Sequence, residues 1–165
     1  MPTTITGTDG VSQVQTGAVE AGDLPAGSVL QVKYEIANES RLTTSSTSYV
    51  DTGANISITP MFSNSLIIVE FTFSADTQDF SAIIFTLFKG STELFGNRFG
   101  SDGGGNRIHA TAGRWLGNAT IEYAEFPGST SEQKYDLYFK VDGNGSAAIR
   151  YGKTPAFMRA MEIKQ

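Results

Sequence analysis

Residues 65–75 read SLIIVEFTFSA, and this stretch decides the fold. Apolar side chains occupy every second position, at Ile67, Val69, Phe71 and Phe73. From residue 70 onward, polar side chains occupy the alternate positions, at Glu70, Thr72 and Ser74. Alternation with a period of two is typical of a β-strand that has one buried face. We therefore predict a strand here whose first set of side chains faces a core.

The same period recurs along the rest of the chain. The alternating stretches cover residues 28–37, 41–60, 81–90, 118–126, 134–143, 146–152 and 156–164. Turn-forming sequences such as DGNGS at 142–146 separate them, and no segment has a helical period. With residues 65–75 this makes about eight short strands. The pattern predicts an all-β protein and favours an antiparallel β-sandwich or jelly roll over an open sheet.

The first alternating stretch, SVLQVKYEIA at residues 28–37, has a sharply divided pattern. One set of positions carries Leu30, Val32, Tyr34 and Ile36. The other set carries Val29, Gln31, Lys33 and Glu35. Because the first set is wholly apolar, we expect it to be the buried face of this strand.

The chain divides into an arm and a domain. Residues 1–26 contain few large apolar side chains, Met1, Ile5 and Leu24, so this segment cannot offset its own ordering entropy by burial. We expect residues 1–26 to form an extended N-terminal arm that attaches to a partner, and residues 27–165 to form the sandwich. The part GVSQVQTGAV at 10–19 alternates well enough to add to the sheet edge of a neighbour.

Composition excludes several classes of protein. The 165 residues carry a net charge of −5, which opposes nucleic-acid binding. There is no cysteine, so disulfides and thiolate metal sites are excluded. The longest apolar run, residues 66–69, is far too short to span a membrane, and the N-terminus lacks the features of a signal peptide. We expect synthesis in a cytoplasm and no membrane insertion.

The stretch from residue 93 to residue 115 is the best candidate for a contact surface. It places aromatic and charged side chains among glycines, a combination favoured at interfaces and for stacking on sugar rings. The candidate residues for a partner or glycan contact are Phe95, Arg98, Phe99, Asp102, Arg107 and Trp115. The alternative is that these rings close one end of the sandwich core.

No motif predicts catalysis, a cofactor or a metal site. YGKTP at 151–155 lacks the first glycine of a phosphate-binding loop and continues into proline. DGNG at 142–145 lacks most ligands of a calcium loop and is better explained as a hairpin turn. His109 is the only histidine. Carboxylates such as Asp76 and Glu93 lie in or near turns, where they are expected to be solvated rather than paired in a hydrolase cleft.

Four stretches resemble a family of tailed-bacteriophage virion proteins, which includes tail-fibre proteins with a C-terminal jelly-roll domain. They are PTTITGTDGVSQVQTGAVEAGDLPAGSVLQV (2–32), TSSTSYVDTGANISITP (44–60), SNSLIIVEFTF (63–73) and FMRAMEIKQ (157–165). The resemblance covers nearly the whole chain, although none of the four has the specificity of a metal-ligand motif. The shaft repeats of a long fibre are missing.

The resemblance implies a homotrimeric jelly-roll knob displayed on a virion that is assembled in the cytoplasm of a bacterial host. Residues 1–26 would then attach the knob to capsid or tail proteins, as a capsid decoration, head fibre or tail appendage. It implies no catalytic residues. Two other functions stay open at this point: a carbohydrate-binding module that recognises a host surface glycan, and an enzyme that degrades surface polysaccharide.

Overall fold

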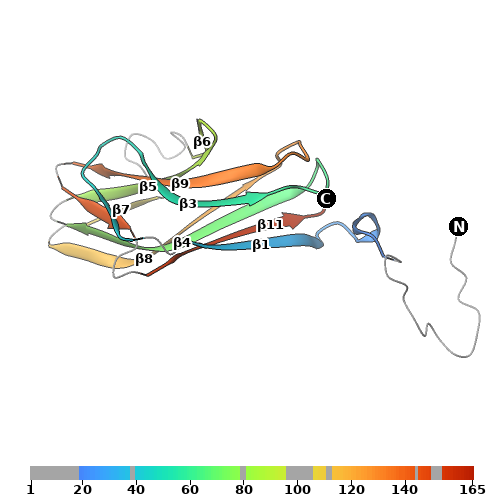
Figure 1. Cartoon of the computed structure of the whole chain (residues 1–165), viewed down its shortest axis with the longest axis horizontal. Helices are drawn as coiled ribbons and strands as arrows, with labels where there is room; N and C mark the ends of the chain where they lie inside the picture. Colours follow the sequence, from blue (N-terminus) through green and yellow to red (C-terminus); the bar gives the residue numbers. More distant parts are fainter. Residues whose placement is uncertain are drawn as a thin grey trace, which may run out of the picture.

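The computed structural model describes residues 19–37, 40–78, 81–95, 106–110, 113–143, 145–149 and 154–165. Within this part of the chain two antiparallel sheets pack face to face (Figure 1). The six-stranded sheet contains β1 (Val29–Ala37), β11 (Ala156–Ile163), β4 (Leu66–Gln78), β8 (Arg114–Glu125), β10 (Ala147–Ile149) and β2 (Leu42–Thr44). The five-stranded sheet contains β3 (Val50–Ile58), β9 (Gln133–Asp142), β5 (Ala82–Lys89), β6 (Thr92–Glu93) and β7 (Arg107–His109).

The strand order is that of a jelly roll. In the first sheet β1, β11, β4 and β8 are neighbours in that order, and in the second β3, β9, β5 and β7 follow one another. Taken in chain order, these eight strands pass from one sheet to the other at every step except between β5 and β7, as two nested Greek keys require. The short strands β10 and β2 extend the far end of β4. The predicted all-β, jelly-roll-like sandwich is confirmed.

The core lies between the two sheets and contains the side chains that the alternation selected. From the first sheet the inward positions of β4 are at most 1% exposed, and Phe71 is fully buried. From the second, Tyr135, Leu137 and Phe139 of β9 are also fully buried. Phe73 and Phe85 join the sheets edge to face, with 4.7 Å between ring centroids. Burial of these rings is the main driving force for the fold.

The prediction for β1 is wrong in its direction. Val32 is 54% exposed, Tyr34 58% and Ile36 46%, so these three members of the apolar set face outward instead of into the core, while Leu30 is half-buried. The reason lies on the other side of the strand, where Gln31 donates hydrogen bonds to the buried carboxylate of Glu162 (2.6 Å) and to the carbonyl of Thr59 (2.7 Å). These bonds hold Gln31 inward, and its even-numbered neighbours must then point outward.

A β-bulge at the start of β1 adds a further outward side chain. The pairing with β11 shifts between Val29 and Gln31, so that Val29 lies opposite Ile163 while Gln31 lies opposite Glu162. The extra residue changes which face the preceding positions occupy. Val29 is consequently 53% exposed, like Val32, Tyr34 and Ile36 further along the strand.

Glu162 is a buried structural clamp. Besides the bond from Gln31, its carboxylate accepts hydrogen bonds from the backbone N–H groups of Met61 (2.8 Å) and Phe62 (3.2 Å). It therefore joins β1, β11 and the turn before β4. Burial by itself would raise the pKa of Glu162, but the hydrogen bonds from Gln31, Met61 and Phe62 outweigh it and hold the pKa below the ordinary value of 4.5.

This clamp predicts a pH dependence of stability. Because the folded pKa of Glu162 is depressed, its contribution is present above the unfolded value of 4.5 and is lost as the pH falls through the folded pKa. Glu162→Gln should lower the free energy of unfolding by about 1–3 kcal/mol at pH 7. The difference between the two proteins should shrink in acid, as measured by urea unfolding at pH 7 and pH 3. Parallel pH profiles would contradict the assignment.

The end of the chain fastens the segment before β1. The 3₁₀ helix η1 (Ala21–Asp23) lies at the same end of the sandwich as the C-terminus (Figure 1). Lys164 Nζ donates hydrogen bonds to the carbonyls of Gly22 (2.6 Å) and Leu24, and its backbone pairs with Gly27 and Ser28. Residues 22–28 are therefore tied to the folded body. Residues 1–18 of the expected arm lie outside the described residues.

Candidate assembly surface

The outward face of the six-stranded sheet is unusually apolar. Its edge strand β1 presents four apolar side chains, each about half exposed: Val29, Val32, Tyr34 and Ile36. An antiparallel sheet that faces water normally carries polar residues on that side. Partly exposed apolar side chains of β11 and β4 continue this surface, which we call the outer face.

The register aligns these side chains in rows across the sheet. Val32 lies opposite Met161 on β11, and Met161 lies opposite Ile68 on β4. One row nearer the C-terminal end of the sandwich, Ile163 lies between Val29 and Leu66 in the same way. Tyr34 stacks on Phe157 at a centroid distance of 6.2 Å. Cross-strand neighbours thus form apolar rows on the outer face.

A charged row crosses the outer face between two apolar ones. Arg159 lies opposite Tyr34 on one side and Glu70 on the other, and its Nη2 atom bonds to the Glu70 carboxylate at 3.1 Å. On β8, Glu122 lies directly opposite Glu70 and is exposed. The row thus holds one guanidinium and two carboxylates, and like charges directly opposite one another repel.

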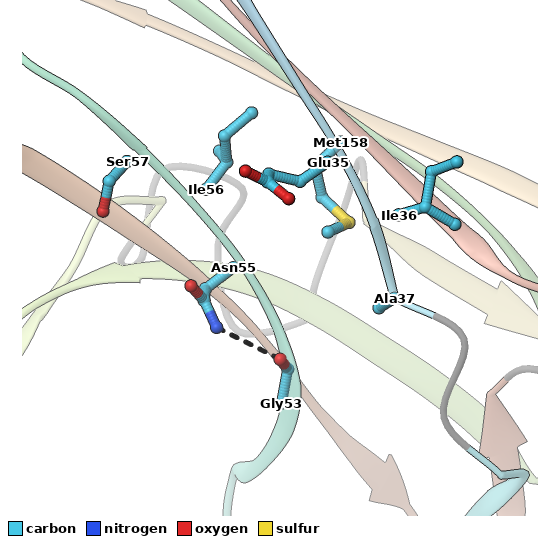
Figure 2. A pocket seen from close by; sticks show the side chains of 8 residues that line it. All are labelled: Glu35, Ile36, Ala37, Gly53, Asn55, Ile56, Ser57 and Met158. Atoms are coloured by element: carbon cyan, nitrogen blue, oxygen red, sulfur yellow. Dashed lines mark hydrogen bonds between the residues drawn. The ribbon is translucent and has the colours of Figure 1, made fainter.

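The inner side of β1 borders a groove of about 570 Å³ between β1 and β3. Figure 2 shows Glu35 reaching from β1 towards β3, with Met158 beside it, while Ile36 points to the opposite side of β1. Across the groove Asn55 bonds to the carbonyl of Gly53 (3.1 Å). The groove between β1 and β3 is open, so it can accommodate the side chain of Glu35. Charged side chains turned inward at an edge strand also discourage edge-to-edge aggregation.

Three of the six predicted contact residues lie in the described part of the chain. Phe95 is half-buried and meets Tyr123 edge to face, with a centroid distance of 5.4 Å. Trp115 is also half-buried against the core, and its ring lies so close over Gly117 that a Cβ atom there would be 2.8 Å from it. Both rings thus contribute to packing.

Arg107 is the third of these residues. It is exposed on β7 and pairs with Asp142 at 2.8 Å. It also borders a cavity of about 190 Å³ with Phe73 and Phe85. The other three, Arg98, Phe99 and Asp102, lie outside the described residues. A partner or glycan contact at this end of the sandwich therefore stays a prediction.

The expectation that Asp76 is solvated is wrong, because its carboxylate is held in a buried ion-pair network. It is 1% exposed and accepts two hydrogen bonds from Arg114, at 2.6 and 2.7 Å, and one from Arg41 at 3.0 Å. This network joins β4, β8 and the residue before β2. Within the described ranges no three His, Cys, Asp or Glu side chains gather as a metal site would require.

Two tyrosines have raised pKa values for structural reasons. The pKa of Tyr135 is raised mainly by burial and next by the hydrogen bond that its hydroxyl donates to Glu125 (2.7 Å). Lys89 bonds to the same carboxylate at 2.6 Å. The pKa of Tyr49 is raised by burial and by the neighbouring charge of Glu93. Raised values of this kind keep both phenols neutral and hydrogen-bonded inside the fold.

The chain matches no protein-family model, and no curated protein matches it with significant similarity. None of the helical residues that the structure describes forms a span long and apolar enough to cross a membrane. Fold and surface together define an antiparallel jelly-roll sandwich with an apolar outer face.

The outer face is the surface feature that the sequence pattern did not reveal. The alternating pattern separates the two sides of β1. It cannot tell which side faces the core, because β1 is an edge strand and a groove separates it from β3. One available signal was Gln31, which stands between apolar residues and can donate to a buried acceptor. Recognising it would have required knowing that Glu162 is its neighbour on β11.

Proposed function

We propose that this protein is a non-enzymatic bacteriophage virion surface protein: a homotrimeric jelly-roll knob that is attached to the particle by its N-terminal arm. Such a protein acts by association. It is placed on a capsid or tail during assembly, and its exposed loops then face the host or the solvent. The four stretches that resemble phage virion proteins and the jelly-roll strand order support this proposal.

The observation that carries the proposal is the apolar outer face. Monomeric soluble proteins seldom expose a contiguous apolar patch of more than a few hundred Å², and larger patches mark binding surfaces. Here Val29, Val32, Tyr34 and Ile36 of β1 are all about half exposed on one side of the sheet. In a protein that functions within an assembly, such a face is buried against a neighbouring molecule and is therefore stabilising.

Removal of residues 1–18 tests the attachment. The cut precedes Gly22 and Leu24, whose carbonyls bind Lys164, so the sandwich should fold as before. We expect its free energy of unfolding to change by less than about 1 kcal/mol. Binding to phage particles should fall at least tenfold, measured by co-sedimentation of purified protein with particles that lack it.

Lys164→Met provides the control, because it weakens the fastening of residues 22–28 while leaving the arm intact. This variant should still bind particles. Equal co-sedimentation of the truncated and full chains would show that residues 1–18 do not mediate attachment.

A further inference from the structure

We propose that the outer face is a contact between copies of this chain, in which Arg159 of one copy meets Glu122 of the next. This inference rests on the proposed function and names the surface through which its subunits join. The occupant of the outer face is thus a second copy of the same jelly roll, and neither a host protein nor a different virion protein.

The size of the outer face fits a subunit contact. β1 has nine residues, which corresponds to a length of about 30 Å, and four neighbouring strands give a width of about 15–20 Å. With the relief of its side chains, a face of these dimensions approaches the roughly 800 Å² that each partner contributes to a stable interface. A small ligand would cover only part of it.

The charged row indicates that the occupant is another copy. Arg159 bonds to Glu70 through one terminal nitrogen, Nη2. Its side chain is 43% exposed, so the guanidinium can take a second carboxylate. Glu122 makes no ion pair among the described residues, and it lies beside the like charge of Glu70. A second copy supplies both missing partners at once.

This contact also explains the reversed polarity of β1. Inward, the strand carries Gln31, Lys33 and Glu35, and outward it carries apolar side chains beside Phe157 and Met161 of β11. Once a neighbouring copy covers the outer face, the apolar set is buried between subunits. In a threefold ring the arrangement is heterologous, with Arg159 of each copy facing Glu122 of the next around a closed circle.

The test is the molar mass of the full chain in solution, by light scattering during size-exclusion chromatography. The wild-type protein should have three times the chain mass of 17.7 kDa. Val32→Glu places an unpaired charge on the outer face and should weaken association roughly a hundredfold. Met61→Glu is the matched control, because Met61 is 55% exposed but lies in the turn before β4, away from the outer face. It should remain trimeric.

Charge reversal tests the proposed pair itself. Glu122→Arg should weaken association about tenfold, and adding Arg159→Glu in the same chain should restore most of the loss. Circular dichroism of each variant verifies the fold. A double variant weaker than either single one would rule out the contact between Arg159 and Glu122.

The other outcomes separate this inference from the proposed function. A trimeric Val32→Glu protein would overturn the inference while leaving a trimeric virion protein intact. A wild-type dimer that Val32→Glu dissociates would keep the outer face as the contact but contradict the threefold ring, and a dimer that Val32→Glu leaves intact would overturn the inference. A wild-type monomer would overturn the inference and the proposed trimer together, whereas attachment through residues 1–18 would still be judged by co-sedimentation.

Discussion

Phe71→Ala is expected to destabilise the protein by about 3–5 kcal/mol, enough to leave much of the chain unfolded at physiological temperature. Phe71 is fully buried on β4, in the middle of the six-stranded sheet, where it lies between Met158 on β11 and Ile121 on β8. Truncation removes its transfer free energy and leaves a cavity that two flanking strands cannot easily close. Urea unfolding followed by circular dichroism, at one fixed protein concentration, measures the loss.

Phe126→Ala supplies the comparison for this prediction. Phe126 has the same side chain but is 62% exposed, beyond the end of β8. Its truncation should cost less than about 1 kcal/mol. Similar losses for the two variants would mean that the stability of the sandwich does not depend on the packing between its sheets.

Asp76→Ala should produce the second large effect, a loss of about 2–4 kcal/mol in the free energy of unfolding. The buried carboxylate of Asp76 receives a two-pronged contact from Arg114 and a third hydrogen bond from Arg41. The variant loses all three charge-assisted bonds. Water can partly replace them, because Arg41 is 44% and Arg114 38% exposed, and this keeps the cost below that of a fully buried pair.

Asp142→Ala is the matched control for Asp76→Ala. Asp142 pairs with Arg107 at 2.8 Å, but its side chain is 51% exposed, so the pair is largely screened by water. Its loss should cost less than about 1 kcal/mol. Thermal unfolding at low and high salt adds a second readout. If Asp76→Ala costs no more than Asp142→Ala, the network around Asp76 does not hold β4, β8 and the segment before β2 together.

The alternation of apolar residues predicted most of the fold. In β4, β5 and β9 the apolar set turned out to be the buried one, because both faces of the core are lined by central strands with neighbours on either side. Strand number and turn composition favoured a β-sandwich or jelly roll, and the resemblance to phage virion proteins implied the jelly roll. The short strands β2 and β6 were not predicted as separate strands, since segments of three and two residues have no measurable period.

The edge strand shows where this reasoning fails. At β1 the identity of the inward side depends on the bond between Gln31 and Glu162, which lie 131 positions apart in the chain. An alternating pattern shows that one side of a strand is apolar and the other polar. The apolar side can be buried in the core of the subunit or in a contact with another subunit. For the candidate contact residues Phe95 and Trp115 the sequence left two alternatives, a contact surface and a role in closing the core, and the structure packs both rings against the core.

The fastening of Lys164 to residues 22–28 has a mechanical consequence. A tether through the arm would pull on β1 from its first residue, along the strand axis. The hydrogen bonds to β11 run across that axis, from the pair Gln31–Glu162 to the pair Ala37–Ala156, and would share the load in shear instead of opening one by one. The hydrogen bonds from Lys164 to Gly22 and Leu24 would break first, before the hydrogen bonds between β1 and β11. A knob mounted in this way could withstand drag on a moving particle without losing its first strand.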